Sequence, residues 1–367
     1  MYIWLDESII HQHVGVRRTI INLRNILRQH GVKITFLLQE RLMQQKGLVR
    51  QITFSEYWLS NNGMGFSADY EADGAPFQEI ITLNHLSDLD VATHILSAPW
   101  LVQDFQEVPL LQKYSLMVFL PDLIPLQYSL EGVFESDSWV LSHSAVVEMA
   151  ARNQLKLLVC SYQVAIEVQN LMPANDFLGN IIVIHPGVYV EHLKSFDLNE
   201  TENERQQILM LNILDRRKGM LKAKEFVMSL PAKEKICIIG HSRCSPDDLA
   251  SFLKVMRKHK YRWLKNVSTN EVVKEFNNSK FLLFPSKHEG YGIPAIEANY
   301  FGVPVLTHSN LPVWENLAFK IDLESECLPK FYSSADFVIP ENSEVLKFRS
   351  ELNVGLNHWV NRNFISS

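Results

Sequence analysis

The chain has 367 residues, a length that fits two domains at roughly 100–200 residues each. Hydrophobic residues make up 47% and charged residues 21% of the sequence, which are ordinary values for a soluble globular protein. The formal net charge of -6 gives no electrostatic case for a nucleic-acid partner.

The cysteines and the N-terminus exclude several further classes. Cys160, Cys237, Cys244 and Cys327 show no C-x2-C spacing, so neither a zinc site nor a disulfide framework is indicated, and we expect free thiols in a reducing cytosol. The first residues lack the basic and apolar regions of a signal peptide. No stretch reaches the roughly 18 uninterrupted apolar residues of a spanning helix. The expected location is cytoplasmic, either soluble or peripheral to the inner face of the membrane.

The first half of the chain alternates strand patterns with helix patterns. Short apolar runs predict strands, and apolar residues spaced three and four apart predict helices. Gly31 is expected to end the first helix, and Ser161 to cap a later one that Pro173 ends. The expected strands are residues 2–5, 32–38, 116–120, 155–159 and 181–184, and the expected helices include residues 16–28 and 138–154.

The second half repeats this alternation after a polar connection at residues 191–207. Ser245 and Pro246 are typical of an N-cap followed by proline in the first turn, and Ser268 to Glu271 has capping-box spacing. Strands alternating with helices in both halves predict two doubly wound α/β domains. The expected strands are residues 208–214, 236–239, 281–284 and 305–307, and the expected helices include residues 220–230, 245–258 and an amphipathic 343–363.

Residues 281–297 combine an apolar strand, a loop with two glycines and the start of a helix. In an open parallel sheet, the loop beyond a strand's carboxyl end faces the ligand crevice. Gly290 and Gly292 are expected to leave backbone N–H groups uncovered for an anion at the helix N-terminus. Glu289 and Glu297 would then accept hydrogen bonds from sugar hydroxyls. The alternative is that both glutamates are solvated or only complement the helix dipole.

This segment resembles the E-x7-E signature of glycosyltransferase family four, within the group 1 glycosyltransferases. Members read roughly P-S-x-x-E-G-F-G-L-P-x-L-E-A and then G-x-P-V. The chain carries Pro285-Ser286, Glu289 to Pro294, Glu297-Ala298 and Gly302 to Val305 in that order. The resemblance implies a GT-B fold, in which two Rossmann-like, doubly wound domains enclose an inter-domain cleft.

The implied domain organisation is an N-terminal acceptor-side domain at residues 1–187 and a C-terminal nucleotide-sugar-binding domain at residues 188–342. A C-terminal helix at residues 343–367 is expected to cross back onto the N-terminal domain. Gly15 lies in the loop at residues 11–16 that matches the family's glycine-containing loop near the donor phosphates. The histidines of that loop are either catalysts or surface residues.

The resemblance also implies the residues of the donor site. Lys218 matches the family's lysine that binds the donor diphosphate, where it would stabilise charge on the leaving phosphate; a solvated basic turn is the alternative. Glu289 is the candidate catalytic residue and is expected to bind sugar hydroxyls. The expected donor-binding residues are Gly15, Arg217, Lys218, Gly240, His241, Val267, Gly290, Tyr291, Gly292, Ile293 and Glu297.

Two positions depart from the family's pattern. Family members usually carry a diphosphate-binding arginine six residues before the loop lysine, whereas this chain has Asn212. Either Arg216 or Arg217 supplies the charge instead, or phosphate binding is weaker. Asp122 matches the aspartate of the family's H-D-l-x-P stretch, but Pro121 replaces its histidine. Asp122 is the second candidate catalytic residue, for orienting the acceptor, or else belongs to a buried turn or cap.

The implied activity is that of a retaining hexosyltransferase that acts on a glycan or lipid-linked acceptor in cell-surface polysaccharide or lipopolysaccharide assembly. The donor is expected to be GDP- or UDP-linked, with GDP-mannose preferred, and no metal is expected to be required. A catalytically impaired GT-B binding or regulatory subunit is the alternative. Basic residues within 16–33 and 254–265 indicate either peripheral membrane contact or a solvated face.

Overall fold

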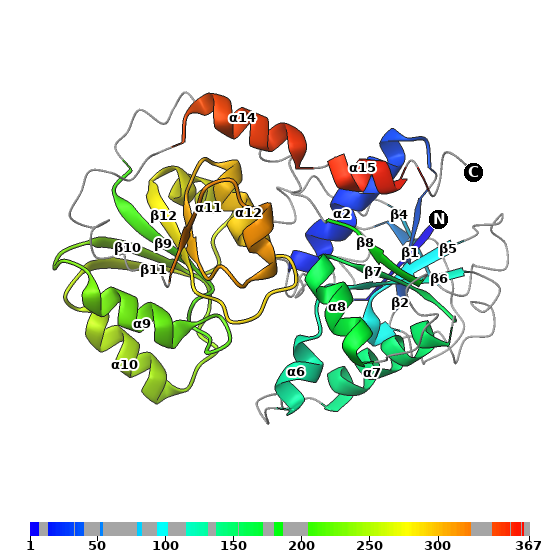
Figure 1. Cartoon of the computed structure of the whole chain (residues 1–367), viewed down its shortest axis with the longest axis horizontal. Coiled ribbons are helices and arrows are strands. Elements are labelled where there is room, and N and C mark those ends of the chain that lie inside the picture. Colours follow the sequence, from blue (N-terminus) through cyan, green and yellow to red (C-terminus); the bar gives the residue numbers. More distant parts are fainter. Residues whose placement is uncertain are drawn as a thin grey trace. The chain divides into compact units, whose positions relative to one another are not determined.

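The computed structural model describes residues 1–6, 14–32, 34–39, 52–53, 79–82, 94–101, 115–130, 137–152, 154–171, 180–185, 205–323, 340–352, 354–360 and 362. The chain divides into two compact units (Figure 1). Unit 1 comprises residues 1–66, 73–189 and 353–367, and unit 2 comprises residues 67–72 and 190–352. The predicted boundary at residues 187–188 lies outside the described residues, as do Pro173, Cys327 and most of the polar connection.

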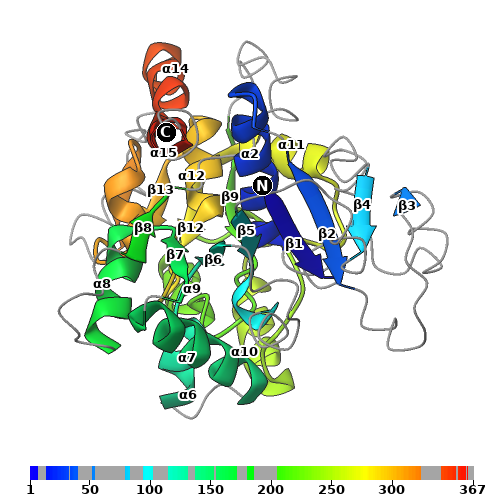
Figure 2. The same cartoon turned by 90° about the vertical axis from the view of Figure 1, so that its right-hand side faces the viewer.

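Among the described residues, the sheet of unit 1 has eight strands, and the first of them lies in the interior of the sheet. The strands are β1 (Tyr2–Asp6), β2 (Thr35–Gln39), β3 (Ile52–Thr53), β4 (Glu79–Thr82), β5 (His94–Ser97), β6 (Ser115–Leu120), β7 (Lys156–Val159) and β8 (Ile181–Val183). Their order is β3-β4-β2-β1-β5-β6-β7-β8, which Figure 2 shows. Only the β3–β4 pair is antiparallel among these neighbours. The order reverses direction at β1, as in a doubly wound sheet.

The first helix of unit 1, α2 (Val14–Gln29), was predicted from the sequence, and Gly31 terminates it as expected. Val32 N–H donates to Leu27 O at 3.0 Å and Gly31 N–H to Arg28 O at 3.0 Å, while Gly31 has a φ of 79°. This is a Schellman motif, so the predicted glycine stop is confirmed. Ser161 also caps its helix as predicted, because its Oγ accepts from Val164 N–H at 3.2 Å. The helices are α2 (Val14–Gln29), η3 (Pro99–Leu101), α6 (Ile124–Leu130), α7 (Asp137–Ala151), α8 (Tyr162–Leu171) and α15 (Val354–Val360).

The sheet of unit 2 is parallel throughout its six strands. The strands are β9 (Gln207–Leu211), β10 (Lys235–Ile239), β11 (Lys260–Leu264), β12 (Ser279–Phe284), β13 (Val305–Thr307) and β14 (Lys320–Asp322). Their order is β11-β10-β9-β12-β13-β14, so the direction of winding reverses between β9 and β12. In open α/β sheets this switch point is where ligands bind, at the carboxyl ends of the strands.

Helices cover both faces of the unit 2 sheet. They are α9 (Met220–Ser229), α10 (Pro246–Met256), α11 (Thr269–Asn277), α12 (Ile293–Tyr300), η7 (Pro312–Asn316) and α14 (Asn342–Glu351). Helices α9 and α10 lie on one face and α11 and α12 on the other (Figure 1), as right-handed crossovers require. Between them, residues 281–284 of β12 are at most 3% exposed, which confirms the prediction of a strand buried on both faces.

The single helix predicted at residues 343–363 is wrong. The structure has two helices there, and α14 packs against α12 in unit 2 whereas α15 packs against α2 in unit 1. Asn357 Oδ1 on α15 lies 3.3 Å from Nε2 of His30, which follows the last residue of α2. Helix α14 ends at Glu351 and α15 begins at Val354, so the predicted helix is interrupted between these residues.

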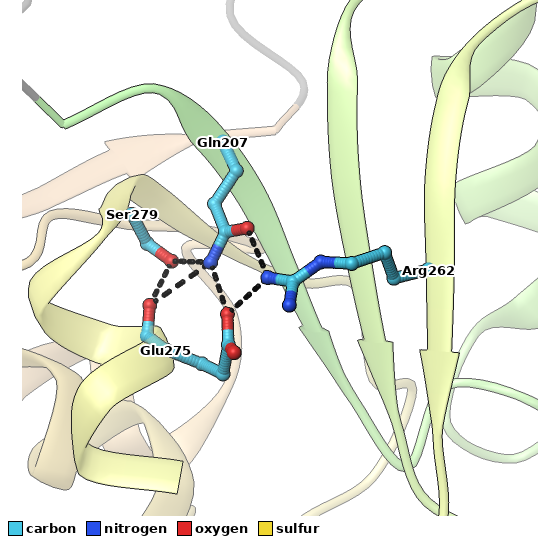
Figure 3. Close-up of polar contacts among 4 residues, drawn as sticks. All are labelled: Gln207, Arg262, Glu275 and Ser279. Atoms are coloured by element: carbon cyan, nitrogen blue, oxygen red, sulfur yellow. Dashed lines mark hydrogen bonds and ion pairs between the residues drawn. The ribbon is translucent and has the colours of Figure 1, made fainter. Parts of the chain in front are cut away.

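A polar cluster joins strands β9, β11 and β12 of unit 2 through α11 (Figure 3), and Gln207, Glu275 and Ser279 are its buried members. Gln207 Nε2 donates to Glu275 Oε2 at 2.7 Å, and Arg262 Nη2 donates to the same oxygen at 2.6 Å. Ser279 Oγ donates to Glu275 O at 2.5 Å. Gln207 and Ser279 are the first residues of their strands. The cluster therefore lies at the amino ends of the strands, opposite the carboxyl ends where the switch point binds ligands in this type of fold.

Replacing Glu275 should destabilise unit 2. The Glu275→Ala substitution leaves the amide of Gln207, which is 6% exposed, without its carboxylate acceptor. We expect a loss of about 2 kcal/mol in the free energy of unfolding. Glu234→Ala is the control, because Glu234 binds Lys280 at 3.3 Å with both side chains partly exposed and should cost below about 1 kcal/mol. Denaturant unfolding measures both; equal losses would contradict the assigned role of Glu275.

The stability of unit 1 should depend on the protonation of His143 in α7. Burial lowers the pKa of His143 from 6.5 to about 4, although its Nδ1 contact with Trp139 O at 2.7 Å opposes the shift. As the pH falls, the unfolded chain therefore binds the proton first. The stabilisation is complete above pH 6.5 and is lost between pH 6.5 and about 4, at a total cost of about 3 kcal/mol.

Unfolding by urea at pH 7.5 and at pH 4.5 tests this dependence. We expect His143→Gln to flatten the fall in stability between these two pH values. The exposed His358, also in unit 1, supplies the control variant His358→Gln, which should keep the fall. A pH profile that is the same in the wild type and in His143→Gln would show that His143 does not carry the effect.

Candidate active site

Two loops of unit 2 meet at the switch point between β9 and β12. We name residues 212–219 the lysine loop and residues 285–292 the glutamate loop. Lys218 Nζ contacts Glu289 Oε1, and Ser286 Oγ donates to the same oxygen at 2.7 Å. The side chains of Lys218 and Glu289 are 20% and 9% exposed. A cation and an oriented carboxylate therefore lie together at the edge where this fold type binds ligands.

The two loops are also fastened through their backbones. Lys287 N–H donates to Arg217 O at 3.1 Å. Gly219, the N-cap of α9, has a φ of 80°, and a Cβ added there would lie 1.8 Å from Pro285 O. Only glycine fits this close approach in this conformation. Because Gly219 has no Cβ, the backbone next to Lys218 can lie against Pro285 of the glutamate loop.

The start of α12 differs from the expectation for Gly290 and Gly292. Both glycines and Tyr291 are buried, so the prediction that their backbone is uncovered is wrong. The reason is packing: a Cβ added at Gly292 would lie 2.8 Å from Val313 of η7. The half-buried Ile293 is the first residue of the helix, and its N–H has no acceptor within the helix.

Glu297 lies on the second turn of α12 and is 8% exposed. The alternative of a solvated glutamate is therefore excluded at this position. The carboxyl end of the helix is held by two arginines: Arg205 donates to Gly302 O at 2.6 Å and to Phe301 O at 3.0 Å, and Arg349 donates to Tyr300 O at 2.8 Å. Cations stabilise this end of a helix dipole, so α12 is anchored at the end opposite its first turn.

Three further predicted donor residues follow strands β10 and β11. His241 Nε2 lies 2.8 Å from Asn266 Oδ1, and Trp263 Nε1 donates to Gly240 O at 2.8 Å. Lys265 Nζ lies 4.0 Å above the Trp263 ring. Gly240, His241 and the half-buried Val267 thus follow adjacent strands at the same sheet edge as Lys218. Their roles toward a donor stay predictions.

Arg216 and Arg217 are the two arginines expected to supply the positive charge that is absent at Asn212. Their surroundings in the structure differ. Arg216 donates to both carboxylate oxygens of Asp248, at 2.7 and 3.1 Å, and this hydrogen bonding lowers the pKa of Asp248 below its ordinary value. Among the described residues, the Arg217 side chain makes no such contact with a carboxylate, and Arg217 is the direct neighbour of Lys218 in the chain. Asn212 itself has a φ of 52°, a left-handed conformation that asparagine tolerates.

The remaining predicted residues belong to unit 1. Asp122 Oδ1 accepts from Ile124 N–H at 3.1 Å at the start of α6, which agrees with the turn or cap alternative. Gly15 was expected in a loop, but it is the second residue of α2. It therefore lies in the first helical turn, after the central strand β1. The histidines at positions 11 and 13 lie outside the described residues.

The basic stretches and thiols have ordinary surroundings. Lys260 and Arg262 lie on β11, the edge strand, where charge discourages pairing with another chain. Cys160, Cys237 and Cys244 are free thiols. Among the helices described for this chain, none combines the length and the hydropathy of a bilayer-spanning segment. Within the same residues, no group of His, Cys, Asp and Glu side chains is arranged to hold a metal ion.

Comparison with known families identifies the segment that carries the two loops. Residues 193–340 match the family model of glycosyl transferases group 1. The matched segment is less than half of the chain and contains both Lys218 and Glu289.

Relatives and solved structures extend the comparison. The serotype-specific mannosyltransferase WbdA of Escherichia coli is 30% identical over 115 residues, which are 30% of this chain and only 14% of that protein. The crystal structure of WaaG, a glycosyltransferase involved in lipopolysaccharide biosynthesis, aligns with a TM-score of 0.60 at 15% identity over 99% of each chain. Anabaena HepE in complex with UDP and glucose aligns with a TM-score of 0.59 at 13% identity, over 99% of this chain and 95% of that one.

At these low identities the solved structures establish the fold. The chain has the GT-B fold, with two α/β units built on largely parallel sheets, as predicted from the sequence. The group 1 match and the shared fold together support the GT-B glycosyltransferase superfamily.

Proposed function

We propose that the chain is a retaining glycosyltransferase of family four, which transfers a hexose from a nucleotide-sugar to a glycan or lipid-linked acceptor. The observation that carries the proposal is the meeting of Lys218 with Glu289 at the switch point of unit 2. A cation suits a diphosphate, and an oriented carboxylate suits sugar hydroxyls. The E-x7-E pattern of Glu289 and Glu297 and the group 1 match support the same conclusion.

In the proposed reaction, the bond between the anomeric carbon of the sugar and the diphosphate oxygen breaks. The acceptor oxygen bonds to the same face of that carbon through an oxocarbenium-like state, and its proton passes to the departing phosphate oxygen. Lys218 stabilises the negative charge that grows on this phosphate. Glu289 holds sugar hydroxyls and does not act as a nucleophile. No step is assigned to a metal ion, because Lys218 and the start of α12 supply positive charge.

The donor and acceptor follow from the relatives as proposals. The name of the Escherichia coli relative supports mannose, for which GDP-mannose is the donor we prefer. Anabaena HepE was solved with UDP and glucose, which keeps UDP-linked donors in the test. WaaG's role in lipopolysaccharide biosynthesis supports an acceptor in cell-surface polysaccharide assembly. We propose a cytoplasmic protein at the inner face of the membrane, with the basic residues of α2 as the peripheral contact.

Asn212 and Pro121 favour a second candidate, a catalytically impaired GT-B binding or regulatory subunit. At Asn212 the chain lacks a cation that the family uses to grip the diphosphate. Pro121 O accepts a hydrogen bond from Cys160 Sγ at 2.6 Å, so this position serves backbone packing in unit 1. This candidate predicts nucleotide binding without turnover.

One panel separates the two candidates. The chain is incubated with GDP- and UDP-sugars, with and without lipid-linked acceptors, while release of GDP or UDP is measured; calorimetry measures the binding of each nucleotide. We expect acceptor-dependent nucleotide release. Binding without release under every acceptor condition would support the impaired subunit, and the absence of any nucleotide binding would refute both candidates.

A further inference from the structure

The Lys218–Glu289 contact pairs two charges that the proposed reaction assigns to different parts of the donor. Lys218 is assigned to the diphosphate and Glu289 to the sugar, yet Nζ of the lysine contacts Oε1 of the glutamate. With 20% and 9% of the two side chains exposed, water screens this attraction only partly. A diphosphate that binds Lys218 therefore competes with Glu289 for the same ammonium group.

The ion pair can exchange partners without separating the loops. The lysine loop and the glutamate loop are joined independently by the Lys287 N–H bond to Arg217 O and by the close approach of Gly219 to Pro285. Neither backbone contact involves the charges of Lys218 or Glu289. Loss of the ion pair therefore leaves the two loops joined through their backbones.

Ser286 keeps the carboxylate oriented when the ammonium group leaves it. Its Oγ donates to Glu289 Oε1 at 2.7 Å, and Ser286 is only 1% exposed. Among the described residues, no hydrogen bond is made to Glu289 Oε2. Glu289 therefore retains accepting capacity for a sugar hydroxyl in a fixed direction.

We propose that Glu289 makes the site prefer an intact nucleotide-sugar over the free nucleoside diphosphate, by competing with the diphosphate for Lys218. This inference rests on the proposed function. With an intact donor, the phosphate takes Lys218 and a sugar hydroxyl takes the carboxylate. With a nucleoside diphosphate, the carboxylate loses its cation, gains no hydroxyl and stands beside a second anion, which is unfavourable in a buried position. The product nucleotide therefore leaves more readily than the donor.

Calorimetric titration tests this preference with GDP against GDP-mannose and with UDP against UDP-glucose. The wild type should bind the sugar-linked form of its nucleotide more tightly than the free diphosphate. In Glu289→Gln, we expect the free diphosphate to bind roughly tenfold tighter while the sugar-linked form gains nothing, so that the preference falls by a similar factor. Glu225→Gln on α9, a 70% exposed position in the same unit, makes the same charge change and should leave the preference within about twofold of the wild type.

The Lys218→Gln background separates competition for the lysine from general repulsion by the carboxylate. Without Lys218, the gain from Glu289→Gln should shrink to about twofold or less. Glu289→Ala replaces Glu289→Gln if the latter fails to show cooperative thermal unfolding, with the same expected result. An unchanged preference in a folded Glu289 variant, or a full gain without Lys218, would overturn the inference and leave the proposed function standing. A wild type that binds neither nucleotide would refute the proposed function itself.

Discussion

Lys218→Met is expected to reduce sugar transfer by about 100- to 1000-fold while the protein still folds. Lys218 is the cation that the structure places at the switch point against the glutamate loop, and it is only 20% exposed. In the proposed reaction it acts on charge that develops as the donor's diphosphate leaves. Its removal should therefore lower the rate of the chemical step more than it weakens binding of the donor.

The measurement is the acceptor-dependent release of GDP or UDP, with kcat and KM determined separately. Lys222→Met is the matched control, since Lys222 lies on α9, after the lysine loop, is 38% exposed and approaches Glu225 at 3.9 Å. This control should retain the wild-type rate. A Lys218→Met protein that transfers sugar within about threefold of the wild-type rate would remove Lys218 from the mechanism.

Arg217 is the arginine that we propose as the substitute for the cation missing at Asn212. Arg216 is engaged by both oxygens of Asp248, so it serves to join the lysine loop to α10. The sequence left these two arginines equivalent, because the distance from Arg216 to Asp248 along the chain is 32 residues and their contact is a product of the fold. We therefore assign the second positive charge of the proposed site to Arg217.

The sequence predicted most of the architecture of unit 2 because its signals there are local. Ser245 and Ser268 cap α10 and α11 as their spacing indicates. The apolar run at residues 281–284 marks a buried central strand. Strand β11 was missed because it lies at the sheet edge: its first three residues are exposed, so it carries Lys260 and Arg262 and lacks an apolar run.

In the candidate site, too, the sequence predicted local features but not the contacts between distant segments. The chemical identities of Lys218 and Glu289 could be predicted from a motif, but their direct contact spans 71 residues and depends on β9 and β12 being neighbours. Ser286 was overlooked as a functional residue, although its position three residues before Glu289 was a usable signal. The covered backbone at Gly292 could not be predicted, because Val313 reaches it from a separate 3-10 helix.

Gly219→Ala is expected to be among the most destabilising single substitutions in unit 2. The backbone at Gly219 has a φ of 80°, which alone costs alanine roughly 1–2 kcal/mol. The added Cβ would also lie 1.8 Å from Pro285 O, and a backbone carbonyl cannot rotate away as a flexible side chain does. We expect a total loss of about 4 kcal/mol or more in the free energy of unfolding. Because the clash separates the lysine loop from the glutamate loop, nucleotide release should be lost as well.

Gly31→Ala isolates the contribution of the close approach. Gly31 has nearly the same φ, 79°, and no atom lies within 4 Å of a Cβ added there. This control therefore carries the conformational cost of roughly 1–2 kcal/mol without the clash, and it should keep nucleotide release. Denaturant unfolding, with the transition of each unit followed separately, measures the loss in the free energy of unfolding for both variants. If Gly219→Ala costs no more than Gly31→Ala, the two loops do not meet as tightly as the proposed site requires, and the pairing of Lys218 with Glu289 loses its structural basis.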